Sequence, residues 1–485
     1  MKNIEKKKKK TRKLKAFKVR SIGPFILSLM IVIAVVIAAF VAVLFAKVNI
    51  PLIDDRITFC VAIGFLLVII LAFVLTSLSD RKRSVADGEA LEEIIAEAEK
   101  VLREAEEEER KEAEAAEVRL TVGDDSDTGE RFSRLSAIDR AEIKEPEYKD
   151  DVDLKRLCED FRNYAASKKG LYYDIKTVRS FVSGLAVSRL VIFQGMSGTG
   201  KTSLACAFGD FLKNPSVLIP VQPSWKEKTD LVGYFNEFTK NYNETELLAK
   251  IYEAGGNGKM YITVLDEMNI ARVEYYFAEF LSVLEMPDPE RRLIEIVSDS
   301  VPGDPERIID GKVKLPENMW YIGTANNDDS TMAISDKVYD RAMIIDLDRR
   351  ALPFDAPEVE AYPVSYEKFA SLIKQAKRRY GLTLRNRRRI EQLDSYLIEN
   401  LGITFGNRIM RQIEGYVPVY VACGGSELEA IDTILAKKVL RKLESKNPVY
   451  VRNAAAALSL YLDELFGEES MPICRAMLSG FDALT

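Results

Sequence analysis

Apolar residues are concentrated in two long runs near the start of the chain. Neither the first run, 23–46, nor the second, 57–78, contains a charged residue. At 1.5 Å per residue, a helix of either length crosses a hydrocarbon core of about 30 Å. The segment between them, 47–56, includes a proline and two adjacent aspartates. The pattern predicts a transmembrane helical hairpin within residues 23–80.

After the second apolar run, the chain becomes rich in charged residues. Residues 81–120 are rich in Ala and Glu, and their apolar residues recur every three or four positions, which predicts a charged helical stalk. The next segment, 121–150, opens with Gly, Asp, Ser and Thr, which predicts a flexible linker. We therefore expect the soluble part of the chain to begin near Asp151.

Charge is distributed unevenly along the 485 residues. The net charge is −6, but residues 1–20 carry eleven Lys or Arg and one Glu, whereas 85–117 carry fourteen acidic and four basic residues. Basic residues before the first apolar run and at 80–83 place both termini in the cytoplasm. We expect a two-span protein of a bacterial inner or cell membrane. The basic tail, 1–22, either only orients the hairpin or also binds anionic lipid.

A secretory signal peptide followed by one anchor is the competing interpretation of the two runs. Signal-peptide apolar regions are about 7–15 residues long and end at a small-residue cleavage site. The first run is longer and lacks a clear site of this kind. We therefore favour two spans.

The amino-acid composition excludes several kinds of chemistry. The chain contains no histidine, which rules out Ser-His-Asp and Cys-His catalysis and any zinc site that needs a histidine. Its five cysteines are too far apart in sequence to form a CxxC pair. Nothing in their spacing suggests a secreted disulfide framework, so a reducing compartment is expected.

The most specific motif is a glycine-rich loop between a strand pattern and a helix pattern. The apolar run Leu190–Phe193 precedes GMSGTGKT at Gly195–Thr202, and helical spacing continues to Leu212. In such a loop, backbone N–H groups converge on phosphate oxygens at a helix N-terminus. Lys201 would reach the β- and γ-phosphates, and the Thr202 hydroxyl would bind Mg²⁺. The nucleotide-binding residues expected here are Gly195, Ser197, Gly198, Thr199, Gly200, Lys201, Thr202 and Ser203.

Two carboxylates follow a second buried-strand pattern, KMYITVLDE at 259–267. Asp and Glu are rarely buried unless paired, so Asp266 and Glu267 either mark a surface turn or hold a metal ion and a water. Their position about 65 residues after the phosphate loop favours the second interpretation. We expect Asp266 to bind Mg²⁺ and Glu267 to act as general base toward the attacking water.

Two further segments give the sequence a resemblance to AAA+ ATPases. An apolar run from Met319 ends at Asn326, and Arg341 lies within SDKVYDRAMIIDL. The resemblance implies an α/β fold: a P-loop core with a parallel sheet flanked by helices in 151–350, then a helical lid and C-terminal region in 351–485. It also implies that Asn326 positions the lytic water as sensor 1. Arg341 would be an arginine finger on a neighbour's γ-phosphate, within a ring that the resemblance implies to have six subunits.

Within AAA+, the chain is similar to the branch that holds McrB-type restriction NTPases, MoxR and dynein-related ATPases. The similar stretches are VQPSWKEKTDLVGYFNEFTK, LDEMNIARVEYYFAEFLSVLE and GKVKLPENMWYIGTAN. RLIEIVSD and GKVKL would form the β-hairpin that this branch inserts before sensor 1. FGNRIMRQIEGYV and AIDTILAKKVLRKL resemble lid helices, which makes Arg408, or Arg411 three residues on, the sensor 2 arginine that contacts nucleotide.

Several departures from the McrB pattern limit what can be carried over. A membrane hairpin stands where a DNA-binding domain would be, the sensor 1 stretch reads GTAN rather than GTMN, and Arg341 has no adjacent arginine at the finger. No NKxD guanine signature occurs. We therefore expect ATP with Mg²⁺ rather than GTP.

The sequence thus predicts a membrane-tethered AAA+ ATPase that couples Mg-ATP hydrolysis in a ring to remodelling of an unidentified cytoplasmic protein or complex. The alternative is a nucleic-acid-directed NTPase motor of a McrB-like defence system. A basic cluster at 377–389 could serve nucleic acid, but a solvated face or a subunit contact is favoured, and no nuclease signature occurs. A non-catalytic nucleotide switch is disfavoured because it would need neither Glu267 nor Asn326.

Overall fold

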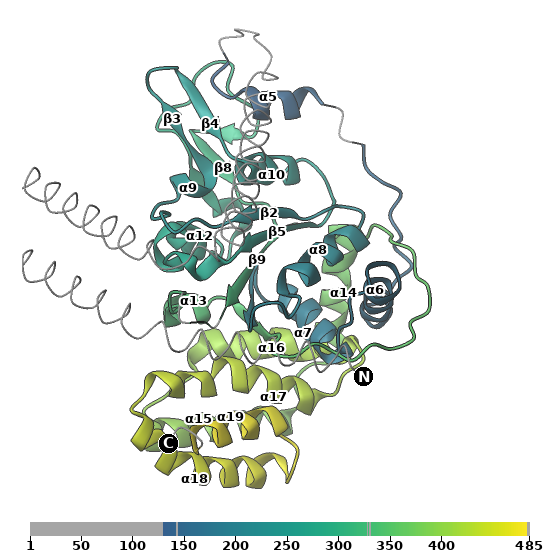
Figure 1. Ribbon diagram of the computed structural model, residues 1–485, viewed down its shortest axis with the longest axis vertical. Coiled ribbons are helices and arrows are strands. Elements are labelled where there is room, and N and C mark those ends of the chain that lie inside the picture. The colour runs from purple at the N-terminus through teal and green to yellow at the C-terminus, as the bar shows by residue number, and fades with distance from the viewer. Residues whose placement is uncertain (1–129, 142–143, 327, 329–330, 483–485) are drawn as a thin grey trace, which may run out of the picture. The chain divides into compact units, whose positions relative to one another are not determined.

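The computed structural model describes residues 130–141, 144–326, 328 and 331–482 (Figure 1). The expected basic tail, transmembrane hairpin, stalk and first part of the linker lie outside these residues. Within the described part of the chain, no helix is both long and apolar enough to cross a membrane. The two expected spans therefore remain predictions from the sequence.

A parallel sheet of five strands forms the centre of the fold, in the order β10-β1-β9-β5-β2. Its strands are β1 (Leu190–Gly195), β2 (Val217–Pro220), β5 (Tyr261–Asp266), β9 (Met319–Asn326) and β10 (Met343–Asp346). In register, Val191 lies opposite Ile322 on one side and Met343 on the other. The three strands expected from the sequence thus lie side by side, and their carboxyl ends meet at one edge.

The side chains of each strand alternate between two hydrophobic cores, as the pleat requires. Val191 and Phe193 belong to one core, whereas Leu190 and Ile192 belong to the other. Parallel sheets are covered on both faces, so their strands are apolar throughout. This explains why Leu190–Phe193 shows no alternation of polar and apolar residues.

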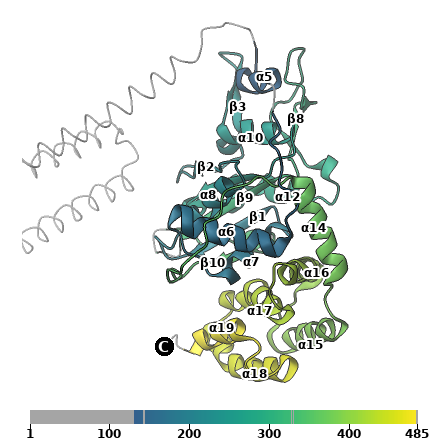
Figure 2. The same cartoon turned by 90° about the vertical axis from the view of Figure 1, so that its right-hand side faces the viewer.

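Helices cover both faces of the sheet, and Figure 2 shows them around it. The first core is covered by α6 (Leu154–Lys169), α7 (Ile175–Leu185) and α8 (Lys201–Phe211). The second is covered by α9 (Thr229–Val232), α10 (Glu246–Ala254), α11 (Val273–Tyr276), α12 (Ala278–Val283) and α13 (Asp336–Tyr339). Local sequence defines the ends of α6: the Asp153 carboxylate accepts a hydrogen bond from the Arg156 N–H at 2.8 Å, and Gly170 ends the helix at φ 65°.

Two small antiparallel sheets are inserted between the central strands. One is the hairpin of β3 (Gly233–Asn236) and β4 (Asn241–Glu244). The other has the order β6-β8-β7, with β6 (Leu293–Glu295), β7 (Ile308–Ile309) and β8 (Lys312–Lys314). Because β6 lies within RLIEIVSD and β8 within GKVKL, their expected pairing is confirmed. The strand β7 and the β3–β4 hairpin were not predicted.

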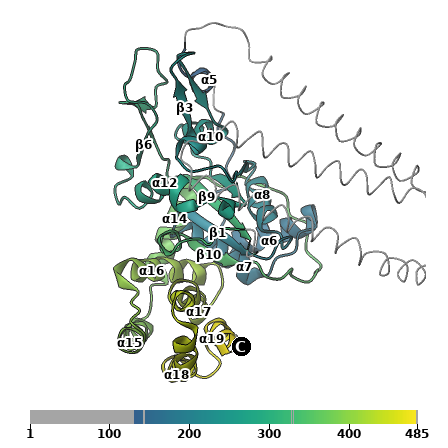
Figure 3. The same ribbon diagram turned by 60° about the vertical axis from the view of Figure 1, so that its left-hand side comes forward.

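The C-terminal part is helical, as expected from the resemblance (Figure 3). Its helices are α14 (Tyr366–Arg379), α15 (Leu384–Leu401), α16 (Gly406–Ala422), α17 (Glu427–Lys438), α18 (Pro448–Phe466) and α19 (Pro472–Asp482), with a 3-10 turn, η3 (Leu440–Ser445). A capping box of Ser426 and Glu429 begins α17. The α14 residue Phe369 packs against Trp320 of β9, with ring centroids 5.7 Å apart.

One local expectation is wrong. The expected linker, 121–150, includes the helix α5 (Ser133–Arg140), because Phe132 and Leu135 are buried in the second core. The stretch after Glu267 forms the turn η1 (Met268–Ile270), then α11 and α12, and a further turn, η2 (Pro289–Arg291). Tertiary hydrogen bonds made by Asn269 account for the first break.

Candidate functional site

The phosphate loop predicted from the sequence joins β1 to α8. Gly195 has φ 148°, and a Cβ there would lie 2.5 Å from the Leu347 carbonyl oxygen. Gly200 caps the N-terminus of α8 at φ 93°. Both positions require glycine, because other residues rarely adopt these angles or would clash with the backbone. The loop therefore brings backbone N–H groups to the start of a helix, where anions bind favourably.

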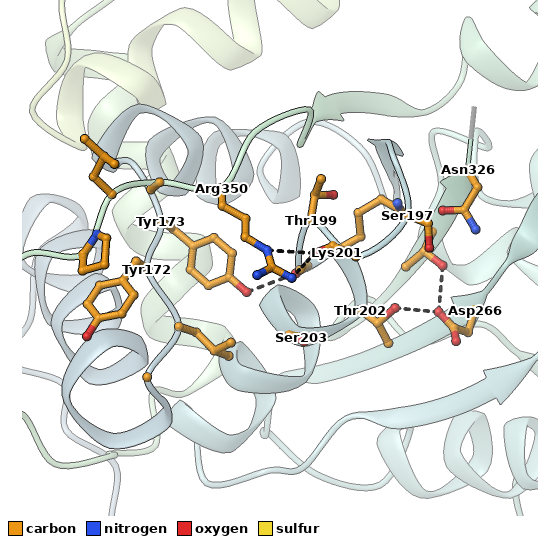
Figure 4. A pocket seen from close by; sticks show the side chains of 18 of the residues that line it. Tyr172, Tyr173, Ser197, Thr199, Lys201, Thr202, Ser203, Asp266, Asn326 and Arg350 are labelled. Atoms are coloured by element: carbon orange, nitrogen blue, oxygen red, sulfur yellow. Dashed lines mark hydrogen bonds between the residues drawn. The ribbon is translucent and has the colours of Figure 1, made fainter. Parts of the chain in front are cut away.

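A cavity of about 720 Å³ lies at the carboxyl ends of β1, β5 and β9. Ten of the residues predicted from the sequence line it: Ser197, Gly198, Thr199, Gly200, Lys201, Thr202, Ser203, Asp266, Glu267 and Asn326. Figure 4 shows the labelled members of this set around one space. Gly195 lies just behind it and contributes its carbonyl oxygen to Lys201.

Lys201 is 6% exposed and lies folded back on its own loop. Its Nζ donates to the carbonyl oxygens of Gly195 at 3.0 Å and Met196 at 2.7 Å. Burial lowers the pKa of Lys201, and the nearby carboxylate of Asp266 opposes that shift. Both hydrogen-bond partners of its Nζ are neutral carbonyl groups. An incoming phosphate would pair this buried positive charge with a negative one.

Asp266 and Glu267 are connected by a residue that sequence reasoning missed. Asp266 Oδ1 accepts hydrogen bonds from Thr202 Oγ1 at 2.7 Å and from Thr324 Oγ1 at 2.8 Å. The same Thr324 oxygen accepts the backbone N–H of Glu267 at 2.8 Å. Glu267 itself has φ 51°, a backbone conformation that is strained for a glutamate. The buried Thr324 hydroxyl thus fixes both carboxylate-bearing residues.

The oxygen atoms of Thr202 and Asp266 fit a magnesium ion. Mg²⁺ prefers oxygen ligands and is usually held by one or two carboxylates together with substrate phosphates and waters. Within the described residues, no cluster of three or more Asp, Glu, Cys or His side chains could hold a metal by itself. A hydroxyl and a carboxylate in contact beside a phosphate loop match a metal that is bound jointly with nucleotide.

Asn326 ends β9 at the rim of the cavity, next to the phosphate loop. Its backbone is fixed by the buried Asn269, whose Nδ2 donates to the Asn326 carbonyl at 2.9 Å. Asn269 also bonds the Met332 carbonyl at 3.2 Å. The segments after β5 and β9 are therefore held to each other, and this link was not predicted.

Aromatic and apolar residues form the other end of the cavity. Its lining there comes from two segments, 170–173 and 350–353. The Tyr173 hydroxyl donates to the Gly200 carbonyl at 3.0 Å, and Arg350 donates twice to the Gly198 carbonyl, at 2.9 and 3.1 Å (Figure 4). None of these residues was predicted, because their role depends on contacts with a loop distant in sequence.

Arg341 and Arg408 lie outside this cavity and line a second one, of about 510 Å³. The second cavity includes Ser188, Arg189 and Leu190, where β1 starts, whereas the first begins beyond its end. Five residue steps along β1 span about 17 Å. The two cavities therefore lie at opposite ends of one strand, and neither arginine reaches the phosphate loop of its own chain.

One carboxylate holds both arginines. Glu285 pairs with Arg341 Nε at 3.3 Å and with Arg408 Nε at 2.9 Å. The cationic side chains that line this second cavity are Arg189, Arg292, Arg341, Lys377, Arg408 and Arg411, and the carboxylates are Glu285 and Glu317. Positive charge is in excess, so the cavity is suited to an anion.

No protein-family model matches the sequence, and no curated protein matches it. Among solved structures, the crystal structure of a full-length MCM homolog from Methanopyrus kandleri is similar, with a TM-score of 0.36 and 12% sequence identity over 61% of this chain and 64% of that one. The chain thus spans less than two thirds of that protein. The described part of the chain has an α/β core, with a central parallel sheet and flanking helices.

Proposed function

We propose that this chain hydrolyses ATP with Mg²⁺ at the cavity beside Lys201. The observation that carries the proposal is the contact of Thr202, Asp266 and Thr324 at the carboxyl ends of neighbouring strands, next to the phosphate loop. Doubly wound sheets bind their ligands at this edge. The exposed Glu267 is adjacent, so a base, a metal ligand and a phosphate cradle share one space.

Each residue then has a distinct task. The loop N–H groups and Lys201 bind the phosphates, and Thr202 with Asp266 would hold Mg²⁺, which neutralises charge on the phosphate oxygens when bound. Glu267 accepts a proton from the attacking water, and Asn326 orients that water. Thr324 keeps Asp266 and Glu267 in place.

We further propose that the site is completed by a second copy of this chain. Arg341 and Arg408 are joined through Glu285 on a cationic cavity that is separate from the phosphate loop. In a ring, this cavity would face the γ-phosphate held by the neighbour. Both arginines would then act in trans, and Arg408 would contact a nucleotide other than that of its own subunit.

The proposal extends to a membrane-tethered ring of six that remodels a protein or complex in the cytoplasm. The two apolar runs at 23–46 and 57–78 support the tether, and the positive flanks support cytoplasmic termini.

One observation favours the alternative of a nucleic-acid motor. Arg378, Arg379, Arg385 and Arg388 are exposed around the junction of α14 and α15. Stimulation of hydrolysis by DNA or RNA would support this alternative.

Mixing two inactive variants tests the composite site. Arg341→Ala keeps its phosphate loop but lacks the arginine, whereas Lys201→Ala lacks nucleotide binding but keeps the arginine. We expect neither to hydrolyse ATP alone and the mixture of full-length proteins to recover activity. An absence of recovery in mixtures that co-assemble, shown by pull-down of differently tagged subunits, would contradict action in trans.

A further inference from the structure

The turn that carries Arg341 is held by side chains of α16, α17 and η3, which we call the lid. Tyr339–Ala342 connects α13 to β10, and the last carbonyl groups of a helix lack partners within it. Here the Arg341 carbonyl accepts the Ser188 hydroxyl at 2.8 Å. The carbonyl groups of the other three residues of the turn bond to one lid residue, Lys438 of α17.

Lys438 is 3% exposed and its Nζ donates in three directions. The distances are 2.6 Å to the Tyr339 carbonyl, 3.1 Å to that of Asp340 and 2.6 Å to that of Ala342. Gln412 of α16 adds a fourth lid contact, to the Asp340 carbonyl at 3.1 Å. Two lid helices therefore hold the backbone on both sides of Arg341.

Neighbouring side chains of the same lid segment reinforce this contact. Arg441 lies 3.0 Å from the ring centroid of Tyr339, and Lys442 pairs with the Asp340 carboxylate at 3.5 Å. Burial lowers the pKa of Lys438 to about 7, Asp340 opposes this shift, and Lys442, Arg408 and Arg441 add to it. The nitrogen can donate in either state, with three hydrogens as an ammonium and two as an amine.

The side chain of Arg341, by contrast, is held by the α/β core. Its Nη1 donates to the Leu281 carbonyl at 3.0 Å, and its Nε faces Glu285 at 3.3 Å. The backbone on both sides of Arg341 is thus held by the lid, whereas its own carbonyl and its guanidinium are held by the core. A shift of the lid relative to the core would move one of these attachments and not the other.

We propose that Lys438 is a positioning residue through which the lid of one subunit sets the place of Arg341 at the neighbour's nucleotide. The inference rests on the proposed function, because it needs Arg341 to act in trans. Lys438 touches neither the nucleotide cavity nor the arginine cavity within the described residues. Its effect passes through the backbone of the turn, and it gives lid movement a direct route to catalysis in the next subunit.

The proposal predicts that a Lys438 variant impairs the site of the neighbouring subunit, to which it supplies Arg341, and leaves its own phosphate loop intact. Lys438→Met is one heavy atom shorter, keeps an unbranched apolar chain and removes all three hydrogen bonds. A misplacement of catalytic groups by about 1 Å can lower a rate by about 10²-fold. We expect kcat of full-length Lys438→Met to fall at least ~10-fold for this reason, with binding of ATP to its own phosphate loop changed less than ~3-fold.

Mixed assemblies separate positioning from a general loss of structure. Lys438→Met mixed with Lys201→Ala should recover activity, because the Lys201→Ala subunit supplies a correctly placed arginine to an intact loop. Lys438→Met mixed with Arg341→Ala should not recover, because neither subunit supplies one. The matched control is Lys176→Met, which removes another contact to α17, the pair with Glu429 at 3.0 Å, far in sequence from the arginine turn. Both mixtures that contain Lys176→Met should hydrolyse ATP.

Recovery in the mixture with Arg341→Ala, or an unchanged kcat of Lys438→Met alone, would overturn the proposal. If the mixture of Arg341→Ala and Lys201→Ala shows no activity, Arg341 does not act in trans. The proposed function then fails, and this inference fails because it rests on that function. If Lys438→Met does not fold, Lys438→Gln, which keeps an amide donor, replaces it in the same mixtures and must show the same asymmetry at smaller size.

Discussion

Thr324→Val removes the hydroxyl that joins the two carboxylate-bearing residues of the site. The substitution keeps the branched shape of a fully buried side chain, so packing on β9 should change little. It deletes one hydrogen bond to the Asp266 carboxylate and one to the Glu267 N–H, both 2.8 Å long. Glu267 then loses the contact that supports its φ of 51°.

The magnitude follows from these two bonds. A hydrogen bond to a charged group contributes about 1.5–3 kcal/mol, and one between neutral groups about 0.5–1.5 kcal/mol. Each 1.4 kcal/mol corresponds to about a tenfold change in an equilibrium or a rate. Thr202 still holds Asp266, and water can reach the exposed Glu267, so only part of this energy is lost. We expect kcat to fall about 10- to 100-fold, with a small change in ATP affinity.

Steady-state ATP hydrolysis and equilibrium nucleotide binding by the full-length protein measure the two effects separately. Thr324→Ser, which keeps the hydroxyl, should stay within about threefold of the wild-type kcat. Thr263→Val serves as a matched control, since Thr263 is equally buried on β5 but takes no part in the hydrogen bonds described for Asp266 and Glu267. A wild-type kcat for Thr324→Val would refute the reasoning that this hydroxyl organises the site.

Two further predictions concern Arg408 and Lys438, and a third concerns the membrane topology expected from the sequence. Arg408→Ala should retain ATP binding and lose hydrolysis, with a smaller loss for Arg411→Ala, because only Arg408 shares a carboxylate with Arg341; equal losses would contradict this distinction. The pKa of Lys438 is lowered from 10.5 to about 7, so between these values the unfolded chain binds more protons than the folded one. The free energy of unfolding of the wild type, relative to Lys438→Met, should therefore rise from pH 7 to pH 10 in urea titrations, and a flat difference would contradict it. Cys158 is fully buried and cannot report topology, so an exposed cysteine, Lys446→Cys, should react with a membrane-impermeant maleimide only after cells are permeabilised; reaction in intact cells would place this part of the chain outside.

The parts of the site that were predictable lie within short stretches of chain. The phosphate loop is recognisable because strand, glycines, Lys201 and helix are consecutive, and each glycine has a local backbone reason. Asp266 and Glu267 were singled out because they stand where an apolar strand ends, and Asn326 because the end of a third apolar run fits the AAA+ resemblance. Since parallel strands end at one edge, those positions converge without any knowledge of the strand order.

The missed residues act across long separations. Thr324 is an ordinary buried strand residue until its hydroxyl is placed beside Asp266, and Glu285 has no distinguishing pattern until Arg341 and Arg408 meet it. Lys438 is one of several basic residues in the stretch AIDTILAKKVLRKL. Periodicity alone does not show that its ammonium is buried against a turn nearly one hundred residues earlier in the chain.

The extent of helix and linker was also hard to predict, because tertiary contacts outweigh local pattern. The apolar residues Phe132 and Leu135 look unremarkable in a polar segment, yet they fold α5 onto the second core. The stretch after Glu267 has helical spacing, but Asn269 is used to fix the end of β9 and the helix is broken there. The side-chain hydrogen bonds of an asparagine compete with helix formation in this way.

The central claim is that the cavity beside Lys201 hydrolyses ATP with Glu267 as the base, and one paired measurement tests it most directly. ATP binding and Mg²⁺-dependent phosphate release are measured on full-length wild type and Glu267→Gln. A general base contributes about 10²- to 10⁴-fold to a rate, and the amide keeps the size of the side chain. The account predicts equal ATP affinity and a kcat at least ~10²-fold lower for Glu267→Gln. Equal turnover by the two proteins, or no turnover by the wild type, would contradict it.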